Sequence, residues 1–92
     1  AVITVSANGP LWEIFDAGAF EESLMLSAFN HGVDSIAAVA FVSAPSYLRS
    51  KLGIPDTERI IMGIGLGYRS DDAINDFRSD REDVDSILSI TQ

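Results

Sequence analysis

Three stretches of the chain have the apolar pattern of β-strands. Val2 to Ser6 carries β-branched residues at consecutive positions, as a buried strand does. Residues 36–42 are expected to form a second strand or an extended loop, with small alanine side chains that suit close approach. The stretch from Ile60 to Gly67 alternates strictly, which predicts a third strand.

Between the first two strands the spacing changes to that of a helix. The apolar residues from Leu11 to Phe15 are expected to be a connector, and Asp16 is then the expected N-cap. A helix is predicted over residues 17–31, closed by Gly32 in the position that favours a left-handed conformation. One stripe of this helix is formed by Phe20, Leu24, Ser27 or Ala28, and His31. Because further apolar residues flank that stripe, the helix is expected to be buried centrally or between subunits.

The second half of the chain predicts shorter helices. One begins near Pro45 and stops at Gly53, and another is opened by Asp71 and Asp72, whose charges suit a helix N-terminus. The tail, residues 82–92, is expected to be a short helix followed by an extended arm that docks on something. Strands and helices alternate, so residues 1–92 predict one domain of the α+β or α/β class.

The strand from Ile60 has one face of large side chains and one face that is nearly bare. Glycine weakens a strand interior unless something must approach the backbone closely, such as a ligand or a second backbone. The bare face is formed by Ile61, Gly63, Gly65 and Gly67. Close packing is the favoured interpretation. The alternative is a planar anionic ligand, because Arg69, Arg78 and Arg81 follow the strand.

Composition narrows the function classes. The net charge of −8 argues against nucleic acid and anionic membrane surfaces as partners, since both require a basic footprint. No apolar run approaches the roughly 20 residues of a membrane span. Cysteine is absent, which excludes disulfides and thiolate chemistry and is typical of a cytoplasmic protein. A chain of 92 residues that is 47% hydrophobic is expected to bury apolar surface against another chain or segment.

Several motifs of known chemistry do not fit. The glycines lie inside the strand with a spacing of two, whereas the dinucleotide fingerprint follows a strand and opens a helix. His31, the only histidine, is expected to cap the helix C-terminus, and no metal site is predicted because no second ligand accompanies it. The acidic residues from Asp71 to Asp85 lack the spacing of a calcium loop and predict a solvated face.

An anion site is the chemistry that the residues still allow. Arg78 and Arg81 are three positions apart, and together they are able to hold a phosphate if both side chains point inward. If both point outward, they pair with Asp76, Asp80 and Glu82 instead. From local sequence alone the outward pairing is favoured.

The order of motifs resembles the C-terminal half of the FMN-dependent nitroreductase family, in particular its nitrobenzoate-reductase-like bacterial members. The likeness begins with a helix bearing Glu22-Ser23 and continues to Ser35. It is carried most specifically by LGIPD at residues 52–56, the strand ending in LGY at residues 66–68, and N-x-[FY]-[RK]-S-x-R at residues 75–81. It extends over nearly the whole chain.

This resemblance implies an intertwined homodimer with a mixed sheet flanked by helices and FMN at the subunit interface. It implies NAD(P)H as electron donor and nitroaromatics or quinones as acceptors, reduced by hydride transfer. By the same resemblance Arg81 matches a phosphate-binding arginine, while Arg78 and Ser79 lie where some members carry a basic residue. The implied flavin-lining segment is Ser35, Ile36, Ala37, Ala38 and Val39. No residue of this chain is assigned a catalytic role.

The family's N-terminal segment, with its Arg-x-Ser-x-Arg phosphate motif, has no counterpart in the 92 residues. Half of the phosphate site is therefore missing, and the chain alone is expected to bind flavin weakly or not at all. A non-catalytic dimerisation module and a small-ligand-binding module stay open as alternatives to a flavoenzyme.

Overall fold

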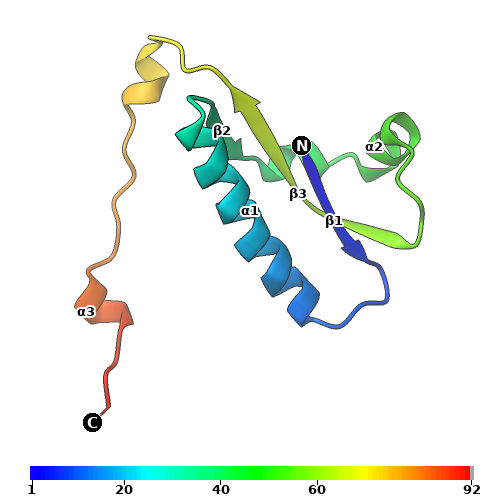
Figure 1. Ribbon diagram of the computed structural model, residues 1–92, viewed down its shortest axis with the longest axis horizontal. Coiled ribbons are helices and arrows are strands. Elements are labelled where there is room, and N and C mark those ends of the chain that lie inside the picture. Colours follow the sequence, from blue (N-terminus) through cyan, green and yellow to red (C-terminus); the bar gives the residue numbers. More distant parts are fainter. Residues whose placement is uncertain (92) are drawn as a thin grey trace.

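The computed structural model describes residues 1–91 and places a three-stranded sheet beside one long helix (Figure 1). The strand order is β1 (Val2–Ser6), β3 (Glu58–Gly67) and β2 (Asp34–Ala37), and both pairings are antiparallel. The first and third strands occur where the sequence predicts them. The second is shifted, because β2 ends at Ala37 and residues 39–42 of the predicted range form a 3-10 helix. The α+β class is confirmed, and β3 is the central strand on which both neighbours depend.

Helix α1 (Trp12–Asn30) starts earlier than the sequence analysis predicts. The expectation of a connector over residues 11–15 is wrong, and Asp16 lies inside the helix rather than at its N-cap. The first turn forms directly after Pro10, whose carbonyl accepts a bond of 3.1 Å from the Glu13 amide. No residue from 11 to 15 breaks a helix, and Glu13 suits the dipole of the first turn.

The end of α1 is as predicted. Gly32 has a φ of 75°, the left-handed conformation that glycine adopts without a steric penalty. The His31 ring nitrogen Nδ1 lies 2.8 Å from the Ser27 carbonyl oxygen, so this histidine caps the last turn. Its position supports the capping interpretation over a catalytic one.

The core lies between α1 and the sheet. Its buried members are Ile3 of β1, Ala17 of α1 and Ile64 of β3, and Ile64 is only 2% exposed. Leu24 and Met25 of the helix pack against this cluster. The large-side-chain face of β3 therefore faces α1, which explains why Ile64 lies at the centre of the fold.

The opposite face of β3 is covered by the chain itself. After β2 the chain turns into a short 3-10 helix, η1 (Val39–Val42), which crosses the glycine face. A Cβ atom placed on Gly63 would lie 2.5 Å from the Cβ of Phe41, and one on Gly67 would meet nothing within 4 Å. Close packing thus explains Gly63, while Gly67 lies in open space. After η1 the chain forms α2 (Pro45–Leu52), which ends at Gly53 as predicted.

Residues 68–91, here called the arm, leave the sheet at the end of β3 and run away from residues 1–67, here called the body (Figure 1). The arm contains a short 3-10 helix, η2 (Ala73–Asp76), and one short turn of helix, α3 (Val84–Ile87). Its apolar side chains Val84, Ile87, Leu88 and Ile90 are 57% to 79% exposed. The prediction of a short helix followed by an extended segment is confirmed by α3 and residues 88–91.

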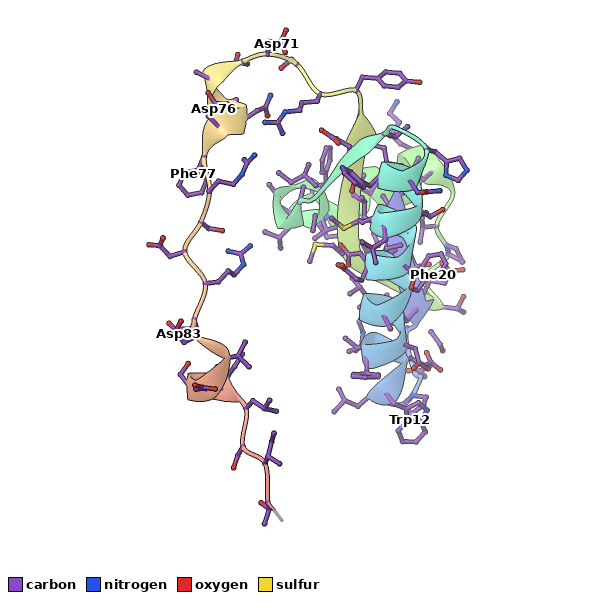
Figure 2. All side chains as sticks on the ribbon, turned by 60° about the vertical axis from the view of Figure 1, so that its left-hand side comes forward. Trp12, Phe20, Asp71, Asp76, Phe77 and Asp83 are labelled. Carbon is purple, nitrogen blue, oxygen red and sulfur yellow. The ribbon has the colours of Figure 1, made fainter. Side chains whose placement is uncertain are left out.

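A large apolar surface is uncovered in the body as well. The large apolar side chains of α1 that are more than half exposed are Trp12, Phe15, Phe20, Leu26 and Phe29. Figure 2 shows Trp12 at the first turn of α1 and Phe20 farther along the helix, while Phe77 and Asp83 lie on the separate arm. The prediction that this surface is buried against another chain or segment stays a prediction. Within residues 1–91 no helix is both long and apolar enough to cross a membrane.

Candidate functional site

A cleft of about 780 Å³ lies where the body meets the arm. Its walls are Phe29 at the end of α1, residues 34–36 of β2, residues 67–70 at and after the end of β3, and five residues farther along the arm: Ile74, Asn75, Phe77, Arg78 and Arg81. The cleft includes Gly67, the glycine that faces open space. Its volume is within the range of pockets that hold small organic ligands.

The charge of this cleft is opposite to that of the chain. Three of the six basic residues, Arg69, Arg78 and Arg81, line it, whereas Asp34 is the one acidic residue in its wall. The chain as a whole carries −8. A cleft lined mainly by positive charge raises the local concentration of anionic ligands, even in an acidic protein.

The arginine side chains do not pair with the neighbouring carboxylates. Arg78 donates to the carbonyl oxygens of Asn75 at 2.9 Å and Phe77 at 3.0 Å. Arg81 donates to the Asp80 carbonyl at 3.0 Å and to the hydroxyl of Ser79. Within residues 1–91 the ion pair is Arg49 with Asp56, at 4.0 Å. The outward pairing with acidic side chains, which local sequence favoured, is therefore wrong.

Four of the eight predicted site residues come together in the cleft. Ser35 and Ile36 of β2 lie in one wall, and Arg78 and Arg81 of the arm lie in the other. The lining does not include the other four, Ala37, Ala38, Val39 and Ser79. Of these, Ala38 and Val39 lie where β2 turns into η1 and approaches Gly63, away from the cleft.

The backbone of β2 offers hydrogen-bonding groups beside the cleft. The Ala38 amide donates to the Gly63 carbonyl at 2.8 Å, and the register pairs Ile36 with Gly65. In an antiparallel ladder, bonded and non-bonded pairs alternate. The N–H and C=O groups of Ser35 and Ala37 therefore point away from β3, toward the open edge of the sheet. Such an edge is able to contact a planar heterocycle through main-chain atoms.

Sequence reasoning missed some residues of the cleft. Arg69 follows the strand in the sequence but is not among the predicted site residues, and Asn75 enters only as part of the family motif. The position of Arg69, directly after a strand whose last glycine faces open space, is the signal that points to it. The aromatic residues Phe29 and Phe77 carried no such signal, since each follows the apolar spacing of an ordinary helix.

The acidic residues of the arm are exposed, as the solvated-face interpretation requires. Asp72 accepts a bond of 3.1 Å from the Ile74 amide and thereby caps η2. Within residues 1–91 no group of three or more His, Asp or Glu side chains is arranged to hold a metal ion.

Comparison with curated proteins gives two similar relatives. The chain is 36% identical over 67 residues to a 4-nitrobenzoate reductase of Nocardioides sp. (strain LMS-CY), covering 73% of this chain and 27% of that protein. It is 30% identical over 82 residues to a 4-nitrobenzoate reductase of Pseudomonas putida, covering 88% of this chain and 36% of that protein. The chain thus spans about a third of the length of these relatives.

Solved structures share the fold, the arm included. The nitroreductase NfnB of Mycobacterium smegmatis, described as FMN-dependent and in complex with NADPH, superposes with a TM-score of 0.92 at 24% identity. The FMN- and NADPH-dependent nitroreductase NfnB of sphigopyxis sp. strain HMH gives a TM-score of 0.91 at 21% identity. Each match covers 99% of this chain and 41% of the other chain. Residues 4–68 match the Nitroreductase family, so the chain belongs to that family.

Proposed function

We propose that this chain is part of an FMN-dependent NAD(P)H oxidoreductase that reduces nitroaromatics or quinones by hydride transfer. The observation that carries the proposal is the cationic cleft between β2 and the arm, in a chain of the Nitroreductase family. Bound FMN would supply the redox chemistry, since its isoalloxazine ring accepts a hydride and passes electrons on.

The residues of the cleft fit the two ends of that cofactor. Arg81 and Arg78 are guanidinium donors without a carboxylate partner within residues 1–91, which suits a dianionic phosphate. The outward-facing main chain of Ser35, in the cleft wall, and of Ala37, next to the cleft, suits the polar edge of a flavin ring. In this proposal the chain binds and orients the cofactor, and none of its side chains transfers a proton.

The electron donor and acceptor are proposed from the relatives. Both curated relatives are named 4-nitrobenzoate reductases, and a solved relative holds NADPH. A nitroaromatic acid is therefore the first acceptor to test, with a quinone as the second. A cytoplasmic location stays a prediction that rests on the cysteine-free sequence.

We also propose that the working form is a homodimer in which residues 1–92 belong to one domain. Support comes from the apolar surface that residues 1–91 leave uncovered on α1 and on the arm. Phe15 is 78% exposed and Ile90 is 79% exposed, and large exposed apolar surfaces commonly mark interaction sites in soluble proteins. The same surface is what a purely structural dimerisation module would show, so activity must be measured directly.

The test uses the full encoded protein. We expect a yellow preparation with about one FMN per chain, and oxidation of NADPH that depends on added 4-nitrobenzoate. Dimerisation without flavin or NADPH oxidation would support the structural module and overturn the enzyme. Binding of other phosphate esters without flavin would indicate a small-ligand-binding protein.

A further inference from the structure

Asn75 differs from every residue around it. Among residues 66–91 it alone is not exposed. Its side-chain amide donates to the Ser70 carbonyl at 2.8 Å and to the Ser70 hydroxyl at 3.1 Å, and its backbone amide donates to the Asp72 carbonyl at 2.9 Å. These bonds close residues 70–75 into a compact turn where the arm leaves β3. In Figure 2 the labelled Asp71 lies within this turn and Asp76 follows it directly.

Two guanidinium groups meet on this turn. The Asn75 carbonyl oxygen accepts a bond of 2.7 Å from Arg69 and one of 2.9 Å from Arg78. The two donor nitrogens share one acceptor, so they cannot lie farther apart than the sum of those distances. Arg69 precedes the turn and Arg78 follows it, and both line the cleft. The turn therefore brings two cations together that are nine positions apart in sequence.

Two like charges this close repel each other, and a carboxylate beside them would compensate their charge. Asp71, Asp72 and Asp76 are near in sequence, yet within residues 1–91 neither guanidinium has a carboxylate oxygen within 4.0 Å. A neutral carbonyl holds both instead. Since a guanidinium has five N–H donors, each arginine keeps donors free for a ligand while its charge is uncompensated. Such a pair is suited to a dianion that bridges the two groups.

We propose that Asn75 is a positioning residue that holds Arg69 and Arg78 as a paired clamp for the phosphate group of FMN. Arg69 is then a phosphate-binding residue in addition to Arg78 and Arg81. The inference rests on the proposed flavin function. The clamp is assembled before the ligand arrives, so the loss of side-chain freedom on binding is reduced. No bond is made or broken in this role.

The test compares two ligands that differ only by the phosphate group, FMN and riboflavin, on the full encoded apoprotein. Flavin fluorescence titrations give the dissociation constants of the wild type and of Asn75→Ala and Arg69→Gln. Asn30→Ala is the matched control, because the Asn30 amide makes none of the side-chain hydrogen bonds found within residues 1–91. We expect both test variants to weaken FMN binding about tenfold with riboflavin binding unchanged, and the double variant to lose little more than either single one.

The outcomes separate the inference from the proposed function. Wild-type protein that binds neither flavin overturns both. Wild-type protein that binds FMN normally, with Arg69→Gln unchanged, overturns the clamp and leaves the proposed function standing. Equal weakening of FMN and riboflavin by Asn75→Ala also overturns it, since that result marks a purely structural turn. If Asn75→Ala does not fold, Arg69→Gln still decides, because the bonds that close the turn do not involve the Arg69 side chain.

Discussion

The body and the arm of this chain are built on different principles. In the body, residues 1–67, α1 packs on the sheet and buries Ile64 of β3, although other apolar side chains of α1 are exposed. In the arm, residues 68–91, the apolar side chains are exposed. The conformation of its backbone is held by local hydrogen bonds such as those of Asn75. The body therefore contributes most of the stability of this chain. The arm presents exposed apolar side chains and the arginine residues of the cleft.

The largest expected effect is on the body. Ile64 is 2% exposed at the centre of the core, so Ile64→Ala should lower the free energy of unfolding by about 2–5 kcal/mol. Urea unfolding of the full encoded protein measures this. Leu66→Ala, on the same face of β3 but 48% exposed, is the matched control and should cost much less. Equal losses for the two variants would mean that β3 is not anchored by Ile64.

The next effect concerns the boundary between body and arm. Arg81→Ala should weaken FMN binding by about 1.5–3 kcal/mol, because a charged hydrogen-bond donor to the phosphate is lost. Lys51→Ala removes the same charge from α2, outside the cleft lining, and should leave the affinity nearly unchanged. Flavin titration measures both. An unchanged affinity in Arg81→Ala would remove Arg81 from the proposed phosphate site.

The sequence predicted the elements of this chain where a local signal marks them, in the body and in the arm. Strand alternation at Ile60 to Gly67 and the Gly32 and Gly53 helix ends are local signals, and all three appear where the sequence places them. The start of α1 was misplaced because Asp16 resembles an N-cap, although residues 12–15 already satisfy helix geometry after Pro10. The helix starts without a side-chain cap at Leu11, so a search for a capping residue misses its true beginning.

The cleft depended on contacts that no local pattern encodes. The sequence indicated arginines after a bare strand, but it favoured carboxylate partners for them, because acidic residues are adjacent in the chain. The structure instead directs these guanidinium groups to backbone carbonyls. The resemblance to the family, rather than spacing, linked residues 35–36 with Arg78 and Arg81. Arg69 is absent from the predicted site because its partner, the Asn75 carbonyl, is six positions away in an irregular turn.

A smaller effect tests the bare face of β3. Gly63→Ala places a methyl group against Phe41 of η1 and should cost about 1–3 kcal/mol of stability. Gly67→Ala is the matched control on the same face, since nothing lies within 4 Å of its added Cβ atom. It should be neutral or slightly stabilising, because alanine loses less entropy in a strand than glycine does. Thermal unfolding of both variants measures the difference. A destabilising Gly67→Ala with a neutral Gly63→Ala would reverse the assignment of the packed and open ends.

The smallest effect asks what the arm is for. Ile87 on α3 is 74% exposed, so replacing it by alanine removes no contact that the body needs for folding. If the arm docks on a second copy of the chain, Ile87→Ala should weaken the dimer about tenfold, the cost of leaving part of one side chain unburied. Sedimentation over a range of protein concentrations measures the dissociation constant, with Asp85→Ala in the same turn as the control. A dimer unaffected by Ile87→Ala would assign dimerisation to α1 alone. The arm would then act only through the arginine residues that it brings to the cleft.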